Sequence, residues 1–532
     1  MDSKHLSTLE IPRADTSNAA AVRHDAAMEV RTNAALAQSR LPINPQRPNG
    51  DETALANFIG CYSKGLPHST LGEVNPAAYQ ALLAALASGK VADFEQLPRG
   101  LGEKLCNPLA ANTYTLQGRD SHSFSLQPAP TFSGAGMAAD MVELYWQAQL
   151  RDVNFSDYTS SALVQRAAAD LNRLSGDAAS HYIYSHATPA NIFRGFGPRD
   201  LAGPAISQFL LKPYPLNSGT QDQTVRVGMP GVDYVRSYDE WSQFQAGLTP
   251  VQTEVFDAKQ RYIRNGRDLA QWVHYDYPQL AFQNAAFIVF DSRPETILNK
   301  NVYQLNVSNP YKASLNQTGF VTFGMVHLLS LISFASTEAL HAAWCQKWMV
   351  HRRLRPEAMG GRVHNRSTGA AQYPIHAQLL DSDAARYTFQ QQGNYLLSQA
   401  YVEGSPLVPS YPSGHAAVAA AGATLMKAFF DENALVPNAV APSADGLSVA
   451  PYNDLALTIG DESDKLAYNI AMGRNWAGVN YRSDAAAGLL LGEEVAIGIL
   501  CDAADALTET FPGFQFTRFN GTPVTIKQSG RS

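Results

Sequence analysis

The stretch Pro409-Ser-Tyr-Pro-Ser-Gly-His415 leads directly into an alanine-rich run that continues to Phe430. Prolines, serines and a glycine before such a run predict a tight turn into the N-terminus of a helix. Backbone N–H groups at a helix N-terminus bind anions with the help of the helix dipole. Ser413 would add a hydroxyl donor, and His415 in the first turn could act as a general acid or base. The alternative is helix capping by Ser413 beside a structural histidine.

Two other segments of the C-terminal half carry cations that could meet this turn. Lys347 lies in the predicted helix Val321–Val350, and the proline after Arg355 biases that arginine away from the helical conformation. Arg474 ends another predicted helix, and Asn480 follows six residues later in a loop. The segment with Lys347 and Arg355 alone could be an ordinary solvated basic helix end. Together they predict a site for a tetrahedral oxyanion or a developing alkoxide.

Alanine- and leucine-rich segments at helical spacing recur along the chain and predict an all-α multi-helix bundle with long packed helices and little β structure. Helices are predicted over Pro76–Ala87, Met137–Val153, Ser160–Ser175, Pro250–Asn265, Arg267–Phe287, Val321–Val350, Gly414–Phe430, Asp464–Met472 and Ser483–Ala506. Short hairpins are predicted within Thr224–Val235 and Phe514–Lys527. We expect residues 1–50 to form an N-terminal arm and residues 51–532 a single large helical domain, with the active-site half at about 320–505.

Composition narrows the class of protein further. The 532 residues are 45% hydrophobic and only 16% charged, which is enough apolar content for a large core. The net charge of −7 argues against nucleic-acid binding. Charged and histidine residues interrupt the longest apolar stretches, and no signal peptide is evident, so we expect a soluble, cytoplasmic protein without a membrane span. The cysteines form no Cys-x-x-Cys pair and favour buried free thiols: Cys61, Cys106, Cys345 and Cys501.

The three segments, in this order, resemble the vanadium-dependent haloperoxidase and type 2 phosphatidic-acid phosphatase superfamily. The wording Lys347-Trp-Met-Val-His-Arg-Arg-Leu-Arg-Pro-Glu-Ala-Met-Gly-Gly361 is similar to the algal and bacterial haloperoxidase branch, as are Asp200–Leu210 and Asn265–Tyr277. The resemblance runs from about residue 140 to 505. It implies that His415 is the acid–base histidine. It also implies that vanadate oxygens would contact Lys347, Arg355, Ser413, Gly414 and Arg474.

Two positions depart from the family pattern. The axial histidine that bonds vanadium is expected six residues after the last arginine, where this chain has Asn480. An amide nitrogen offers no lone pair to a metal, and asparagine cannot form the phosphohistidine of the related phosphatases. Val408 stands where algal bromoperoxidases have a histidine. We therefore predict no cofactor, since Asn480 replaces the residue that would bind vanadate.

Three functions remain open on these residues. The one they favour is a cofactor-independent isomerase that catalyses an α-hydroxyketone rearrangement, a 1,2-shift of a prenyl-type substituent on a naphthoquinone-derived meroterpenoid intermediate. The chain is similar in this respect to a vanadium-independent homologue of napyradiomycin biosynthesis. The alternative is a vanadium-dependent chloro- or bromoperoxidase that halogenates or cyclises a prenylated aromatic substrate. A scaffold that has lost its chemistry is the third.

In the isomerase, His415 would be the base and proton shuttle. The oxyanion would be stabilised by Lys347, Arg355, Arg474 and Ser413. The substrate would also meet Gly414, Asn480 and Val408. The predicted partner is a small aromatic or prenylated molecule, with neither nucleic acid nor membrane involved. A homodimer is the expected assembly.

Overall fold

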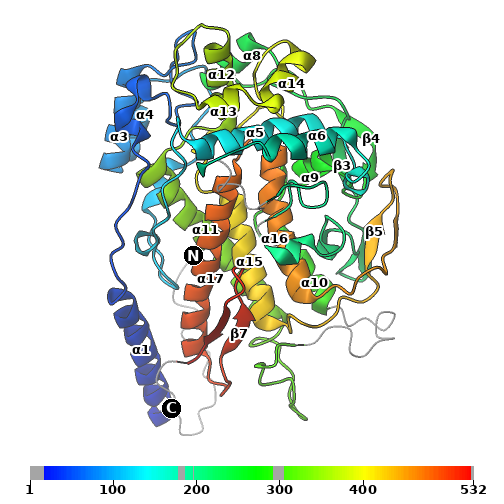
Figure 1. The fold of residues 1–532 in the computed structure, drawn as a ribbon. Helices are drawn as coiled ribbons and strands as arrows, with labels where there is room; N and C mark the ends of the chain where they lie inside the picture. Colours follow the sequence, from blue (N-terminus) through cyan, green and yellow to red (C-terminus); the bar gives the residue numbers. More distant parts are fainter. Residues whose placement is uncertain (1–16, 178–185, 196, 291–304, 529–532) are drawn as a thin grey trace.

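Four long helices form the centre of the protein in a computed structural model that describes residues 17–177, 186–195, 197–290 and 305–528 (Figure 1). They are α11 (Met325–Trp344), α15 (Gly414–Phe429), α16 (Ile459–Trp476) and α17 (Arg482–Ala506). Helix α15 packs against the other three. Every residue of α15 except His415 is buried, because its alanines and glycines let neighbouring helices approach closely. The alanine-rich run therefore forms the centre of the bundle and leaves one histidine accessible at its start.

Shorter helices surround this bundle. Helices α5 (Ala135–Leu150) and α6 (Ala162–Leu171) lie across one end of it, and further helices cover them (Figure 1). The remaining helices are α1 (Ser17–Ser39), α2 (Asp51–Ala54), α3 (Pro76–Ser88), α4 (Val91–Glu95), α8 (Tyr238–Gln245), α9 (Gly266–Trp272), α10 (Leu280–Phe290), α12 (Pro356–Ser367), α13 (Ala377–Leu380) and α14 (Asp383–Gln392). Helix α1, the described part of the predicted N-terminal arm, contacts α17 and is exposed along most of its length.

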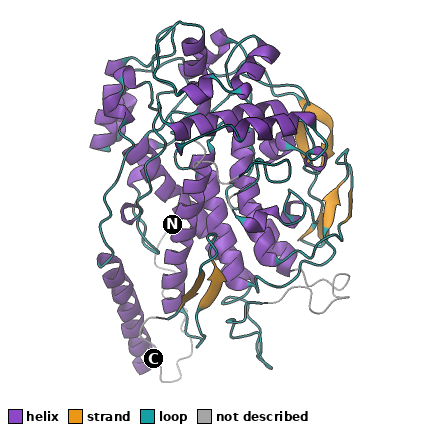
Figure 2. Cartoon of the chain, viewed as in Figure 1, coloured by secondary structure: helices purple, strands orange, loops and turns teal. Residues whose placement is uncertain are grey.

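The strands of the described residues form four separate antiparallel pairs. The pairs are β1 (Tyr214–Leu216) with β2 (Gly219–Gln221), β3 (Val225–Gly228) with β4 (Phe256–Arg261), β5 (Val440–Pro442) with β6 (Val449–Pro451), and β7 (Phe514–Thr517) with β8 (Pro523–Ile526). Figure 2 shows strands at one edge of the helical body and at the lower end of the central helices, where β7 packs against α15. The predicted hairpin within Phe514–Lys527 is therefore confirmed. The architecture is helical with little β structure, as the sequence predicts.

The predicted elements between residues 224 and 290 are partly wrong. The predicted helix Pro250–Asn265 is not a helix: it contains β4, which pairs with β3 from the other predicted hairpin. Thr224–Val235 accordingly forms no hairpin of its own, because its partner strand lies about thirty residues further along. The predicted helix Arg267–Phe287 is two helices, α9 and α10, and Pro278 lies in the loop between them.

The cysteine prediction holds only in part. Cys61 is buried, Cys345 is half-buried, and Cys106 and Cys501 are exposed, all four as free thiols. Although Cys106 as a residue is exposed, its thiol is partly desolvated, and this raises its pKa. The charges of Arg355 and Lys347 lower the pKa by a smaller amount. No helix of the described ranges has the length and apolar character needed to cross a bilayer.

The contact between α15 and α17 predicts one strong effect on stability. A Cβ at Gly492 would lie 1.9 Å from the carbonyl oxygen of Ala417, and one at Gly488 would lie 2.4 Å from that of Ser413. Although alanine favours a helix over glycine, we expect Gly492→Ala to lower the free energy of unfolding by about 1–3 kcal/mol through this overlap. Chemical denaturation measures it, with Leu490→Ala, 53% exposed on the same helix, as a near-neutral control. Equal stability of Gly492→Ala and wild type would contradict the close packing.

Candidate active site

A cavity of about 220 Å³ lies at the N-terminal end of α15. Seven of the eight predicted site residues line it: Lys347, Arg355, Val408, Gly414, His415, Arg474 and Asn480. Its other walls are mostly apolar and come from Cys106, Pro278, Leu340, Trp344, Pro406, Val418 and Ile470, with Asp276 as the further polar residue. The three sequence segments therefore do converge on one site.

Lys347 reaches the cavity from an irregular part of the chain. Helix α11 continues into a π-helical segment, Cys345–His351, and such segments often occur at functional sites. The buried Nζ of Lys347 donates hydrogen bonds to the carbonyl oxygens of Pro409 (2.6 Å) and Ser410 (2.9 Å). Burial lowers the pKa of Lys347 well below its usual value, and the charge of Arg355 lowers it further.

Arg355 and Arg474 approach from two other directions. Arg355 precedes α12 in an extended conformation and donates to the carbonyl oxygens of Val408 and Val479, both at 2.8 Å. Burial and the charge of Arg474 lower the pKa of Arg355 to about 10. Arg474, in the last turn of α16, donates through Nη1 to Val273 O and Tyr401 Oη, both at 3.3 Å. Its buried Nε has no hydrogen-bond partner in the described part of the chain.

These three cations leave the cavity with uncompensated positive charge. Among the described residues, no carboxylate lies within ion-pair distance of Lys347, Arg355 or Arg474, and the partners named above are neutral oxygens. All three side chains are buried, where charge interacts more strongly than in water. The cavity is therefore built to receive an oxyanion.

His415 has a carboxylate partner that sequence reasoning missed. Its Nε2 lies 3.0 Å from Oδ1 of Asp276, whose side chain is 5% exposed and which lies in the loop between α9 and α10. The His415 side chain itself is one-third exposed. When Nε2–H donates to Asp276, Nδ1 is the basic nitrogen of the ring. Asp276 belongs to a segment that resembles the family, but nothing local in the sequence marks it as a partner of His415.

Ser413 is placed differently from the prediction. Its hydroxyl accepts a hydrogen bond from the backbone N–H of Ala416 at 3.3 Å and so caps α15. Ser413 is buried and is not among the residues that line the cavity, whereas the next residue, Gly414, is. The capping role that the sequence left as an alternative is therefore present in the structure.

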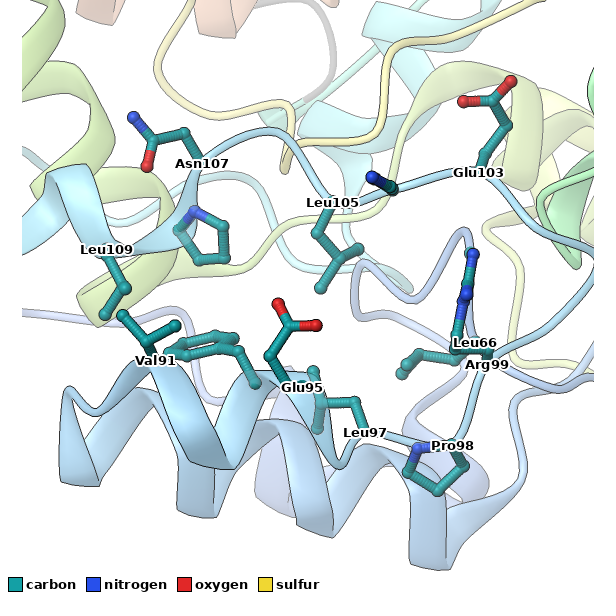
Figure 3. Close-up of a pocket in the computed structure, with 14 residues that line it drawn as sticks. Leu66, Val91, Glu95, Leu97, Pro98, Arg99, Glu103, Leu105, Asn107 and Leu109 are labelled. Atoms are coloured by element: carbon teal, nitrogen blue, oxygen red, sulfur yellow. The ribbon is translucent and has the colours of Figure 1, made fainter.

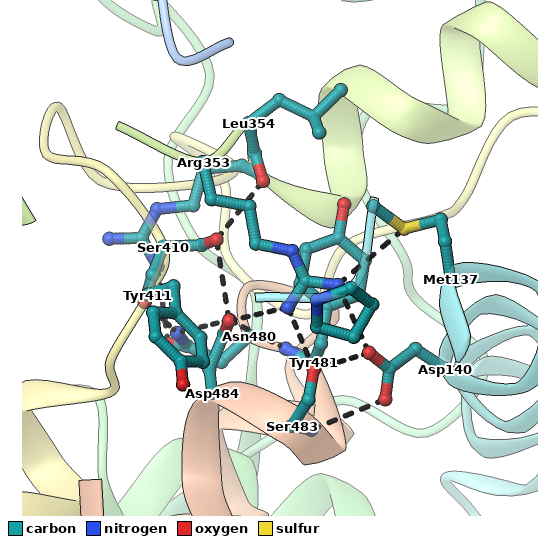
Figure 4. Close-up of polar contacts among 12 residues, drawn as sticks. Met137, Asp140, Arg353, Leu354, Ser410, Tyr411, Asn480, Tyr481, Ser483 and Asp484 are labelled. Carbon is teal, nitrogen blue, oxygen red and sulfur yellow. Dashed lines mark hydrogen bonds and ion pairs between the residues drawn. The ribbon is translucent and has the colours of Figure 1, made fainter. Parts of the chain in front are cut away.

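Asn480 is held on every side (Figure 4). Its Nδ2 donates to the carbonyl oxygen of Ser410 and to Oδ2 of Asp484, both at 3.0 Å. Its Oδ1 accepts from Nη1 of Arg355 at 3.2 Å. Both N–H groups of the amide are thus engaged, and its oxygen faces a cation.

This arrangement does not fit the vanadate that the fold family implies. Lys347, Arg355 and Arg474 suit the oxygens of such an anion, but the family pattern also requires an imidazole nitrogen bonded to vanadium. The nitrogen of the Asn480 amide has no lone pair to give, and its oxygen faces Arg355.

A second cavity, of about 320 Å³, lies beside helix α4 (Figure 3). None of the predicted site residues lines it. Leu105 and Asn107 face this second cavity, whereas Cys106 between them lines the first. The segment therefore separates two cavities, and the predicted site residues line the cavity on the Cys106 side.

His274 contacts Arg474 indirectly, through Tyr401. Its ring stacks on Tyr401, with ring centroids 3.8 Å apart, and Tyr401 contacts Arg474. Nε2 of His274 lies 2.6 Å from Oε1 of Glu403, and Nδ1 lies 3.5 Å from Oε1 of Glu254. Burial lowers the pKa of His274, but the two carboxylates outweigh it, so the pKa is raised overall.

Comparisons with known proteins agree with this architecture. Residues 327–508 match the family model described as the VCPO second helical-bundle domain. The chain is 34% identical to a vanadium-dependent bromoperoxidase of Ascophyllum nodosum over 91% of this chain and 88% of that protein. It is 32% identical to the vanadium-dependent bromoperoxidase of Corallina officinalis, over 91% and 93%.

A solved structure is similar over nearly the whole length. The second vanadate-dependent bromoperoxidase of Ascophyllum nodosum, a homohexamer, superposes with a TM-score of 0.87 at 28% identity, over 95% of this chain and 90% of that one. The chain therefore belongs to the vanadium haloperoxidase family, and the predicted haloperoxidase-like helical fold is confirmed. The predicted homodimer stays a prediction.

The pair formed by His274 and Glu403 predicts a pH-dependent contribution to stability. Because the folded-state pKa of His274 is raised, this contribution is complete below the unfolded-state pKa and is lost as pH rises through the folded-state value. We expect His274→Gln to cost about 1.5–3 kcal/mol near pH 6 and clearly less near pH 9. Denaturation at both values measures this, with the exposed His24→Gln as control. A loss that is equal or greater at pH 9 would contradict it.

Proposed function

We propose that this protein is a cofactor-independent isomerase that rearranges an α-hydroxyketone. The proposed reaction is a 1,2-shift of a prenyl-type substituent on a naphthoquinone-derived meroterpenoid intermediate, as in the napyradiomycin-type homologue that the sequence resembles. The observation that carries the proposal is the fixed amide of Asn480, whose nitrogen has no lone pair for a metal and whose oxygen already accepts a hydrogen bond from Arg355. The cavity has the cations that an oxyanion needs, Lys347, Arg355 and Arg474, and lacks the imidazole nitrogen that a vanadium–nitrogen bond needs.

The reaction needs only a base and a site for negative charge. A base removes the proton of the hydroxyl group, and the bond from the carbinol carbon to the migrating carbon breaks as that carbon bonds to the neighbouring carbonyl carbon. The former hydroxyl oxygen becomes a ketone, and the former carbonyl oxygen becomes an alkoxide that takes the proton back. No atom is gained or lost, and no external oxidant or reductant takes part.

His415 is suited to the proton transfers. It is the one residue of α15 that is not buried, and its contact with Asp276 orients the ring. In the tautomer whose Nε2–H donates to Asp276, Nδ1 is the basic nitrogen. Asp276 also stabilises the imidazolium that forms when His415 takes the proton. Asp276 is thus a positioning residue and His415 the catalytic base.

The three cations are suited to the developing alkoxide. Nε of Arg474 has no partner among the described residues, and Nζ of Lys347 uses two of its hydrogen-bonding positions on backbone carbonyls. Preorganised donors of this kind stabilise charge without rearranging during the reaction. The apolar remainder of the cavity, with Leu340, Trp344 and Val418, suits a prenylated aromatic ketone.

A vanadium-dependent haloperoxidase is the second candidate. It is favoured by the names of the relatives, which are vanadium-dependent bromoperoxidases, and by the same three cations. Asn480 and Val408 stand against it, because the first offers no imidazole nitrogen for vanadium and the second stands where the algal pattern has a histidine. The two candidates differ in one measurable property, the dependence on vanadate.

Replacing the base tests the isomerase directly. We expect His415→Ala to lower kcat for a prenylated hydroxynaphthoquinone-type α-hydroxyketone by about 10²–10⁴-fold, the usual contribution of a general base. Asp276→Asn should lower kcat less and change its pH profile. The exposed pair His122–Asp120 provides the matched control, and His122→Gln should leave turnover unchanged. Unaltered turnover in His415→Ala would refute its role, and a wild type that turns over no hydroxyketone would favour the scaffold.

Vanadate dependence tests the second candidate. After incubation with orthovanadate and dialysis, we expect the wild type to retain no stoichiometric vanadium, and peroxide with bromide should give no halogenation of monochlorodimedone. The Ascophyllum nodosum bromoperoxidase is assayed in parallel as the positive control. Asn480→His asks whether one imidazole restores vanadium retention. Robust halogenation by the wild type would overturn the isomerase in favour of the haloperoxidase.

A further inference from the structure

The active-site cavity is small for the substrate proposed. Its volume is about 220 Å³. Pockets that enclose molecules the size of a drug usually measure about 300–1,000 Å³. A bicyclic aromatic ketone with a prenyl chain belongs to that size class, so part of it must lie elsewhere.

A neighbouring cavity of about 310 Å³ provides the room. It lies where β3 and β4 meet α9 and the start of α10, and it shares one wall residue, Asp276, with the active site. The other residues that line it are mainly aromatic or aliphatic: Val225, Arg226, Phe256, Gln271, Trp272, Tyr275 and Leu280. The guanidinium of Arg226 covers the ring of Phe256 at 3.8 Å. We call this space the Gln271 cavity.

Gln271 is the unusual residue of this wall. It is only 6% exposed, and its Nε2 has no hydrogen-bond partner in the described part of the chain. A buried donor without an acceptor costs about 1–3 kcal/mol, so most such groups in folded proteins are paired. Because Nε2 has almost no accessible surface of its own, a ligand oxygen in the cavity supplies the missing acceptor when the amide turns toward it.

We infer that the Gln271 cavity is the second part of the substrate site and binds the planar aromatic ketone portion, whose carbonyl oxygen accepts a hydrogen bond from Nε2 of Gln271. This inference rests on the proposed function. The aromatic side chains Phe256 and Trp272 suit the flat faces of a bicyclic ring. A prenyl chain in the same place would leave the Gln271 donor unpaired. The carbonyl group that Gln271 binds is therefore distant from His415, and the hydroxyketone group that reacts lies at His415.

A pair of probes with the same ring frame tests the hydrogen bond. 1-Tetralone carries a carbonyl group on a bicyclic frame, and tetralin is the same frame without it. We expect Gln271→Leu to raise the Kd of 1-tetralone about fivefold, as the loss of one hydrogen bond implies, and to leave the Kd of tetralin unchanged. Phe256→Ala should weaken both probes. Calorimetric titration of the full-length wild type and both variants measures all six values.

The controls separate this effect from misfolding. Gln283→Leu changes the same residue type on α10, where Gln283 donates to Ser333, and should leave both Kd values unchanged. Because Gln271→Leu removes an unpaired buried donor, its thermal stability should not fall below that of the wild type. Three results would overturn the inference: no binding of 1-tetralone by the wild type, an unchanged Kd in Gln271→Leu, or an equal loss for both probes.

The outcome is independent of turnover, since neither probe can rearrange. If the probes behave as expected but no hydroxyketone is converted, the Gln271 cavity binds aromatic ketones and the proposed function fails. If conversion depends on His415 but Gln271→Leu binds 1-tetralone normally, the proposed function stands and this inference fails.

Discussion

The buried carboxylate of Asp484 joins the segments of the active site before any ligand enters. Its Oδ1 accepts from Nη1 of Arg353 at 2.8 Å, and its Oδ2 accepts from Asn480 Nδ2 at 3.0 Å and from the backbone N–H of Tyr481 at 2.9 Å (Figure 4). Arg353 also pairs with Asp140. Removing one partner of a buried ion pair typically costs about 3–5 kcal/mol, so this network fixes how the end of the π-helical segment, the turn before α15 and the start of α17 meet.

This network also explains why the cavity is positive. Arg353 is fully buried, and its charge is offset by Asp140 and Asp484, whose carboxylates raise its pKa further against the effect of burial. Lys347, Arg355 and Arg474, by contrast, donate to neutral oxygens. Arg353 is thus compensated, whereas Lys347, Arg355 and Arg474, which line one cavity, are not. An incoming or developing oxyanion would be the missing counter-charge.

Local patterns in the sequence predicted the parts of the fold that are locally determined. Helices α15 and α17 begin and end within one residue of the prediction, because both alanine-rich runs have clear local starts. Ser413 caps α15, and in the first turn of α17 the Asp484 carboxylate accepts from the backbone N–H of Tyr481. Strand β4 was missed because its partner β3 lies far away in the chain, and pairing decides strand formation more than propensity does. Asp276 and Gln271 could not be recognised for the same reason. A carboxylate in a loop and a buried unpaired amide become meaningful only when tertiary structure shows what faces them.

The retained cations argue against a scaffold that merely inherited its shape. Burying a charge without a counter-ion is costly, so Lys347, Arg355 and Arg474 each lower the stability of a protein that binds no anion there. A scaffold would gain stability by replacing any of them with an apolar residue of similar size. Asn480 forms hydrogen bonds with Ser410, Asp484 and Arg355, so it fits the structure of the site. Unlike a histidine, it has no nitrogen lone pair for a metal. An amide where the family pattern has an imidazole, beside a cationic cavity, is the combination expected of the proposed isomerase, whose substrate develops the negative charge during the reaction.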